Sequence, residues 1–174
     1  RIMNRKTRVA VLYGGKSGEH EVSLKSAASV LRYIDRERFE PVPVSIDKQG
    51  RWQCHDLRRI EGANTESLPI PADSPFIRLE PQGEYTAILP ADNATPAIAP
   101  IDVVFPVIHG PLCEDGAVQG LLELAGAAYV GSGVLASAVG MHKDIAKRLA
   151  ALAGLPVAPY LALSRRDWRR DPEG

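Results

Sequence analysis

The feature that most constrains the fold is a short apolar run, VAVLY at residues 9–13, which ends at Gly14 and Gly15. A run without polar alternation is typical of a strand that is buried on both faces of a parallel sheet. After a loop at residues 16–21, apolar residues recur with a helical period at positions 24, 27, 28, 31 and 34. This order predicts an α/β fold with a Rossmann-like parallel sheet and flanking helices.

The rest of the first hundred residues is less regular. Alternating apolar residues at 42, 44 and 46 predict a second strand, which Pro43 moves toward an edge because proline cannot donate to a ladder. Residues 48–50 predict a hairpin turn that leads into Trp52. Residues 61–100 hold seven of the 14 prolines, so we expect an irregular excursion over the surface with one short strand at 85–89.

The sheet pattern resumes at residues 101–108, where IDVVFPVI predicts a strand with Pro106 near its end. Residues 118–125 have helical spacing, with Asp115 as the expected N-cap and Gly126 as the expected C′ residue. We expect the remaining elements to be a very short strand at 129–130, helices at 134–139 and 145–152, a strand at 156–163 and a helix start at Ser164 and Asp167.

The helix and strand expected after residue 141 begin a second unit, and the remaining residues are too few to complete it. We therefore assign residues 6–140 to one α/β domain and residues 141–174 to the opening of a second domain.

Composition argues against several classes of protein. The chain has 21 basic and 21 acidic residues, and general nucleic-acid binding needs a basic surplus. No apolar run approaches the roughly 18 residues of a membrane span, and the basic start lacks the apolar stretch of a signal peptide. The two cysteines have no CxxC spacing. We expect a cytoplasmic protein with neither a membrane nor a nucleic acid as partner.

The loop at residues 14–21, GGKSGEHE, follows the first strand and opens the first helix. Its spacing fits neither a Walker A loop nor a dinucleotide fingerprint, since Ala10 and Lys16 stand where glycines are needed. Glu19 and Glu21 would complement the helix dipole but repel a phosphate, so a carboxylate here suits the ammonium group of a ligand. The alternative is that both acids only stabilise the first helical turn.

The loop at residues 109–116, HGPLCEDG, leaves the next predicted strand and should lie on the same sheet edge as the first loop. His109 beside Glu114 suits a ligand contact or a charge-assisted hydrogen bond between the two side chains. Three alternatives stay open: a capped turn, a Cys113 nucleophile with His109 as its base, and a metal site that includes Asp115.

Two later features are weaker. Residues 131–136, GSGVLA, match a G-x-G-x-x-A fingerprint, but no acid follows about twenty residues on, so tight packing of a turn explains them better. Lys143 and Lys147 lie one helical turn apart on the polar face of a predicted helix, where they are either solvated or in contact with a phosphate.

Three segments of the sequence are more informative together, and in this order, than each is alone. They are GGKSGEHEVSL at residues 14–24 with Ser26-Ala27, HGPLCEDG at 109–116 with Gln119-Gly120, and GSGVLASA at 131–138. In this order they resemble the D-alanine–D-alanine ligases of the ATP-grasp family. The resemblance runs from about Val9 to Leu163 and is far more specific than a single glycine pattern.

The resemblance implies a Rossmann-like (pre-ATP-grasp) N-terminal domain followed by the opening of an ATP-grasp domain. The implied activity is ATP-dependent ligation of two D-alanines through an acyl phosphate, for peptidoglycan precursors. Glu19 would fix the ammonium group of the first D-alanine, Val22 and His109 would contact this substrate, and Lys143 would contact nucleotide phosphate. ATP is a substrate, Mg²⁺ ligands are expected beyond Gly174, and a homodimer is common in the family.

Two positions depart from the family pattern: Cys113 stands where glycine is usual, and His142 where an aspartate commonly precedes the lysine. Because the other nucleotide and metal residues are expected downstream, we expect residues 1–174 to lack ligase activity by themselves. The alternative function is a non-catalytic α/β module that binds a small amine or amino acid.

Overall fold

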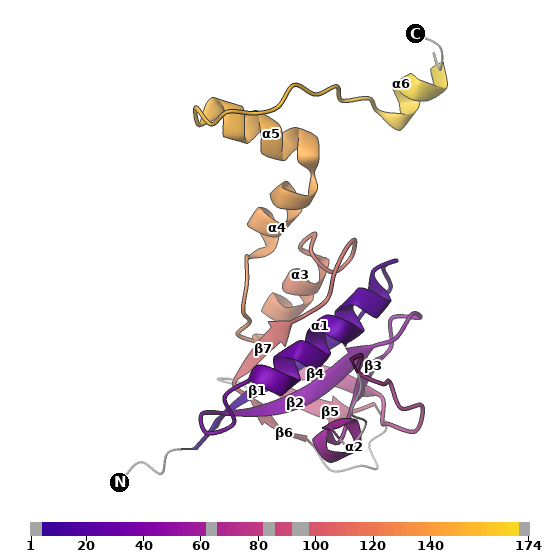
Figure 1. Cartoon of the computed structure of the whole chain (residues 1–174), viewed down its shortest axis with the longest axis vertical. Helices are drawn as coiled ribbons and strands as arrows, with labels where there is room; N and C mark the ends of the chain where they lie inside the picture. The colour runs from indigo at the N-terminus through magenta and orange to yellow at the C-terminus, as the bar shows by residue number, and fades with distance from the viewer. Residues whose placement is uncertain (1–4, 62–65, 82–85, 92–97, 171–174) are drawn as a thin grey trace.

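Four strands form the main sheet of the protein, whose computed structural model describes residues 5–61, 66–81, 86–91 and 98–170. β1 (Thr7–Gly14) runs parallel to β2 (Phe39–Ile46) on one side and to β7 (Val103–Pro106) on the other. β3 (Trp52–Cys54) pairs antiparallel with β2 and completes the order β3-β2-β1-β7 (Figure 1). The predicted buried strand, the parallel sheet and the hairpin turn before Trp52 are confirmed.

β2 lies inside the sheet, so the prediction that Pro43 moves this strand toward an edge is wrong. Pro43 pairs with Val11 of β1, and its carbonyl accepts from the His55 N–H on the side away from β1. The missing N–H of Pro43 would point to that same side. Ile46, at the other parity, faces β1 and accepts from the Gly15 N–H at 2.7 Å. The proline therefore removes no bond from the β1–β2 ladder.

Helices and a second sheet cover the two faces of the main sheet. α1 (His20–Tyr33) and the short α2 (Leu57–Glu61) pack on one face, while α3 (Ala117–Leu124) packs on the other. This arrangement explains the two patterns in the sequence, since β1 is buried on both faces and α1 on one. The first face buries Val9, Val11, Tyr13, Leu24, Ala27, Leu31 and Ile60, and the second buries Ala10, Leu12, Val44, Val118 and Leu122.

The second sheet is antiparallel and joins β4 (Ile77–Pro81), β5 (Thr86–Pro90) and β6 (Ile98–Ile101) in that order. The short strand predicted at residues 85–89 is confirmed as β5, apart from Tyr85, which lies outside the described residues. For the described residues the expected irregular excursion over the surface is wrong, because β4 and β5 form a sheet and bury Ile77 and Ile88 in the same core as the second face of the main sheet.

The strand predicted at residues 101–108 is divided between the two sheets. β6 ends and β7 begins on either side of Asp102. The Asp102 N–H donates to the Arg8 carbonyl at 3.1 Å, and Asp102 Oδ2 accepts from the Arg8 N–H at 2.7 Å. This junction lies at the amino end of β7, whereas Pro106 is the last residue of the strand, as predicted.

The N-cap of α3 lies one residue after the predicted one. It is Gly116, with a φ of 96°, and Asp115 instead accepts from the Leu112 N–H at 2.8 Å and the Ala117 N–H at 3.1 Å. Asp115 therefore organises the turn before the helix. Gly126 follows the helix with a φ of 65°, which confirms the predicted C′ glycine.

Residues 134–170 form an arm that extends from the rest of the molecule (Figure 1). It contains α4 (Val134–Met141), α5 (Lys143–Leu152) and α6 (Arg165–Arg170), and none of its residues is buried. These elements confirm the predicted helices. We call the described residues before the arm the body.

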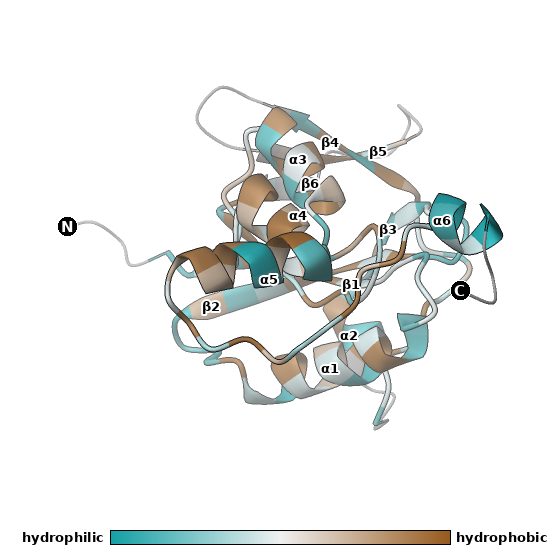
Figure 2. Ribbon diagram, turned by 90° about the horizontal axis from the view of Figure 1, so that it is seen from above, coloured by the Kyte–Doolittle hydropathy of each residue, from teal (hydrophilic) through white to brown (hydrophobic). Residues whose placement is uncertain are grey.

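The arm differs from the prediction at one element and exposes apolar groups. No strand forms at residues 156–163, so that prediction is wrong. Seen from above, α5 carries strongly hydrophobic and strongly hydrophilic residues, and Leu149 and Leu152 are exposed (Figure 2). Within the described ranges, no helix has both the length and the apolar character needed to cross a bilayer.

Candidate functional site

Two loops meet at the carboxyl ends of β1 and β7. Ser23 of α1 joins them, because its hydroxyl accepts from the Gly14 N–H at 2.8 Å and donates to the Val107 carbonyl. Gly14 has a φ of 89°, and a Cβ there would lie 2.3 Å from the Ile46 carbonyl oxygen. His20 is buried and its Nδ1 lies 2.7 Å from the Gly15 carbonyl oxygen. The Gly15 N–H donates to the Ile46 carbonyl of β2, and Ser23 bonds to the residue that follows β7. The first loop is therefore attached to both neighbours of β1.

Glu19 occupies the N-cap position of α1, but its side chain makes no capping hydrogen bond. Its carboxylate lies against the second loop instead, since a Cβ on Gly110 would come within 2.7 Å of Glu19 Oε2. The other acid of the first loop, Glu21, forms an ion pair with Lys48 at 3.0 Å. The hydrogen bond from Lys48 lowers the pKa of Glu21. The two acids are thus in different settings, and only Glu19 faces the second loop.

His109 of the second loop is held in place by side chains of the first loop and of α1. The Ser17 hydroxyl donates to the His109 carbonyl at 2.5 Å and accepts from the Glu19 N–H at 3.2 Å. On the ring, His109 Nε2 lies 3.1 Å from Ser26 Oγ, and Nδ1 lies 3.8 Å from Glu114 Oε1. The structure therefore brings Glu19 and His109 together, as the sequence predicted for the two loops.

Val22 lies one helical turn after Glu19 and one turn before Ser26, so these positions share a face of α1. Its side chain is 50% exposed. An exposed apolar group beside a carboxylate can contact the small apolar part of an amino acid. All three predicted residues of the substrate site thus lie at one edge of the sheet.

Cys113 is not suited to nucleophilic catalysis. Its side chain is buried, and a Cβ on Gly15 would lie 2.8 Å from its sulfur. Burial, together with the charges of Asp115, Glu114 and Glu19, raises the pKa of the thiol to about 11. A thiol that stays protonated at neutral pH is a poor nucleophile, which counts against the hydrolase alternative. Among the described residues, no group of three or more His, Cys, Asp or Glu side chains is placed to hold a metal ion.

Lys143 lies apart from the other predicted site residues. It begins α5, which packs against α4 in the arm, and its Nζ donates to the Gly140 carbonyl at 2.9 Å. His142 before it is the N-cap, with Nδ1 accepting from the Ile145 N–H at 3.4 Å. His142, which stands where the family commonly has an aspartate, therefore still provides a hydrogen-bond acceptor at the N-terminus of α5. Lys147 lies over the ring of Tyr160, 4.8 Å from its centroid.

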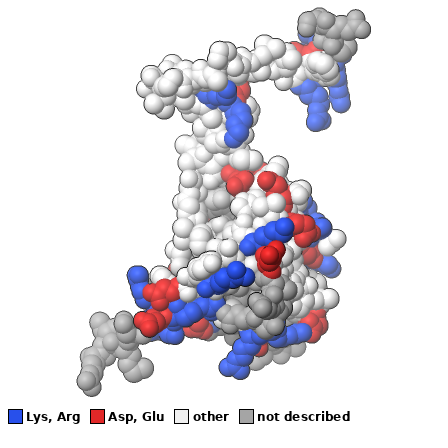
Figure 3. All heavy atoms as spheres, in the orientation of Figure 1, with Lys and Arg blue, Asp and Glu red and all other residues white. Residues whose placement is uncertain are grey.

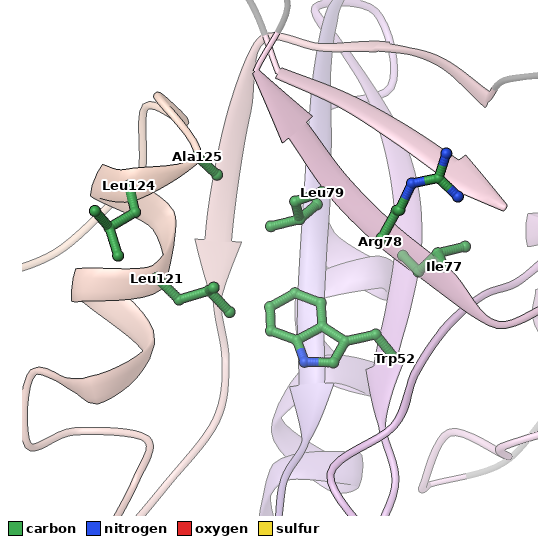
Figure 4. Close-up of a pocket in the computed structure, with 7 residues that line it drawn as sticks. All are labelled: Trp52, Ile77, Arg78, Leu79, Leu121, Leu124 and Ala125. Carbon is green, nitrogen blue, oxygen red and sulfur yellow. The ribbon is translucent and has the colours of Figure 1, made fainter. Parts of the chain in front are cut away.

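Cavities near the two loops and beside β4 lie on the face of the main sheet that α3 covers. One of about 170 Å³ is beside the loops and is lined by Gly15, Lys16 and Cys113 among others. The larger, of about 370 Å³, lies between α3 and β4, where Trp52, Leu79 and Leu121 point toward one another (Figure 4). Neither cavity is lined by Glu19 or His109.

Sequence reasoning did not assign roles to Ser17 and Ser26. Their hydrogen bonds to His109 span 92 and 83 residues of sequence. The only signal available was their place within the first motif, since nothing local distinguishes them from solvated serines.

Comparison with known proteins assigns the chain to a family. A family model described as the D-ala D-ala ligase N-terminus matches residues 8–132. A D-alanine–D-alanine ligase A from Bradyrhizobium diazoefficiens is 64% identical over 168 residues, which cover 95% of this chain and 45% of that protein. The chain thus spans about half the length of the curated relatives it matches.

Solved structures agree with this assignment. A D-alanine–D-alanine ligase from Coxiella burnetii has a TM-score of 0.72 and 32% identity, covering 93% of this chain and 45% of that one. A D-Ala:D-Ser ligase from Enterococcus faecalis has a TM-score of 0.72 and 30% identity, covering 97% of this chain and 48% of that one. The family model matches most of the chain, and both loops lie within the matched residues. The chain therefore belongs to the D-Ala–D-Ala ligase N-terminus family.

Proposed function

We propose that this chain is the N-terminal part of an enzyme that joins two D-alanines at the expense of ATP, through an acyl phosphate. The observation that carries the proposal is the placement of the Glu19 carboxylate against the loop of His109, at the carboxyl edge of the sheet. In open α/β folds this edge is where ligands bind. A carboxylate that faces the edge and is not engaged in capping the helix suits a cationic ligand group.

In this proposal each residue has one role toward the first D-alanine. Glu19 binds its ammonium group by a charge-assisted hydrogen bond. Val22 contacts the methyl group, and His109 limits where the bound molecule can move. Holding the amino acid at its cationic end leaves its carboxylate free to react, which is what formation of an acyl phosphate requires.

ATP contacts are proposed for the arm. The Lys143 ammonium is exposed at the first residue of a ten-residue helix, and both its charge and the helix N-terminus favour a phosphate. We propose that residues 141–174 open the ATP-grasp domain and that the Mg²⁺ ligands lie outside residues 1–174. A homodimer and a cytoplasmic location stay predictions, which light scattering and cell fractionation would test.

Exchange of Glu19 for Gln in the full-length protein tests the role of the carboxylate. We expect kcat/KM for the first D-alanine to fall by about tenfold or more, because a neutral amide replaces the counter-charge of the ammonium. Steady-state phosphate release at varied D-alanine gives this value.

Glu21→Gln provides the matched control. It removes the same charge two residues further on, in the first turn of α1, where the carboxylate pairs with Lys48. Equal effects of the two exchanges would mean that both acids act only through the helix dipole, and normal kinetics of Glu19→Gln would remove Glu19 from the mechanism.

A further inference from the structure

The His109 ring lies between two side chains, Ser26 of α1 at hydrogen-bond distance and Glu114 of the second loop slightly farther away. Ser26 Oγ lies 3.1 Å from His109 Nε2, and Glu114 Oε1 lies 3.8 Å from His109 Nδ1. We propose that Ser26 is a positioning residue, which holds the His109 ring in the form protonated at Nδ1 and turned toward the substrate edge. This inference rests on the proposed function, because it gives His109 its orientation beside the first D-alanine.

The hydrogen positions follow from the chemistry of the partners. An ionised carboxylate can only accept, and a neutral imidazole carries one N–H and one lone pair. Glu114 therefore favours the proton on Nδ1, which leaves the lone pair of Nε2 for the Ser26 hydroxyl. Ser26 is the donor of this pair, and the Nδ1–H faces the Glu114 carboxylate.

The backbone of the loop is held as firmly as the ring. Glu114 Oε2 accepts from the Gly110 N–H at 2.8 Å, and the Ser17 hydroxyl holds the His109 carbonyl. With the main chain fixed on both sides of the ring, the remaining freedom of His109 is rotation about its side-chain bonds. The Ser26 hydroxyl opposes that rotation from a helix that also carries Glu19 and Val22.

The same three residue types form the triads of serine hydrolases, but the surroundings here do not suit that chemistry. A hydrolase needs free backbone N–H groups to stabilise an oxyanion. The Gly110 N–H is already bonded to Glu114. The Gly110 N–H is thus not free to serve as an oxyanion donor, and we assign Ser26 the role of orienting His109.

Ser26→Ala in the full-length protein tests the kinetic part, with Ser29→Ala as the matched control. Ser29 lies on the same helix and is exposed, so both exchanges change helix propensity alike. We expect Ser26→Ala to lower kcat/KM for the first D-alanine by about fivefold to tenfold, the value of one neutral hydrogen bond. The loss should be mainly in KM, with the melting temperature close to that of Ser29→Ala.

A double-mutant cycle with His109→Ala shows whether Ser26 acts through the ring. The proposal expects Ser26→Ala to cause no further loss when His109 is absent. A full loss in that background, or equal losses from Ser26→Ala and Ser29→Ala, would overturn it.

Nitrogen NMR of the His109 ring, without substrate and at pH 9 where an imidazole is neutral, provides a readout independent of activity. We expect the Nδ1–H form in the wild type and a shift of population toward Nε2–H in Ser26→Ala. A wild-type ring protonated at Nε2 would overturn the inference while leaving the Glu19 test untouched. Absence of ligation by the wild-type protein would instead remove the proposed function and this inference with it.

Discussion

Glycines stand at the points where the two loops of the candidate site approach so closely that a side chain would not fit. Gly110 has a φ of 78°, and its Cα faces both Glu19 Oε2 and the Ser17 side chain. Gly15 is in a similar position against the Cys113 sulfur. The glycines of the two motifs therefore set the distance between the loops and so place the carboxylate.

Gly110→Ala should displace Glu19. The new methyl group would lie 2.7 Å from Glu19 Oε2 and 3.1 Å from Ser17 Cβ, in a backbone conformation that L-residues rarely adopt. We expect a loss of about 1–2 kcal/mol in the free energy of unfolding and a fall in kcat/KM for D-alanine of about tenfold or more, measured by denaturant titration and steady-state kinetics. Gly18→Ala is the control, because a Cβ there meets no atom within 4 Å. Similar behaviour of the two variants would contradict this account.

The sequence was sufficient to predict that the loops of Glu19 and His109 lie at one sheet edge, because each loop directly follows a predicted strand. Roles for Ser17 and Ser26 could not be assigned, since their partners lie 92 and 83 residues away and depend on how β7 pairs with β1. Burial of Cys113 was hidden for the same reason, because it comes from contact with the first loop.

Helices and strands were predicted correctly where a local sequence pattern determines the element. The predictions failed where the pairing of strands determines its place in a sheet. β1 and α1 followed from an apolar run and a helical period. For β2, the side to which the missing N–H of Pro43 points depends on register, which the sequence does not display. The strand β4 did leave a signal in Ile77-Arg78-Leu79-Glu80, which alternates apolar and charged residues, but the surrounding prolines obscured it.

A buried histidine directly after β3 joins β2 to the segment before β4. His55 Nε2 lies 2.7 Å from Ser45 Oγ on β2, and Nδ1 lies 2.6 Å from Ser74 Oγ. Burial, with the charge of Arg59 adding to it, lowers the pKa of His55 to about 4, while Asp73 acts in the opposite direction. The neutral ring thus connects the main sheet to the segment that leads into the second sheet.

This histidine should make stability depend on pH. The unfolded chain binds a proton at His55 near pH 6.5 and the folded chain only near pH 4, so the free energy of unfolding should fall as pH drops through this window. Its full contribution is about 3 kcal/mol, present above pH 7. Urea titrations of wild type and His55→Gln between pH 7 and pH 4 would measure it. A constant difference between the two proteins over this range would contradict the assignment.

The whole molecule consists of a body with two sheets and an arm with no buried residues. On the face shown in Figure 3, basic and acidic side chains are interspersed over the body, while basic groups are prominent on α5 and α6. The proposed D-alanine contacts lie in the body and the proposed nucleotide contact lies in the arm. The two halves of the proposed chemistry are therefore carried by different parts of the chain.

Residues 1–174 alone should not catalyse ligation. The relatives are about twice as long, and within the described ranges no cluster of metal ligands accompanies Lys143. We expect the purified chain, mixed with ATP, Mg²⁺ and D-alanine, to release no phosphate above background. The full-length protein under the same conditions is the control, and turnover by the short chain would contradict the proposed division of roles.

The junction at Asp102 has a consequence for how relatives can diverge. The second sheet returns to β7 at its amino end, where Asp102 is bound to Arg8, whereas both functional loops leave from the carboxyl ends of β1 and β7. The end of β6 is thus separated from the edge that carries Glu19 and His109 by the full length of β7. We therefore expect relatives to differ in sequence at the end of β6 without a change in the placement of Glu19 and His109.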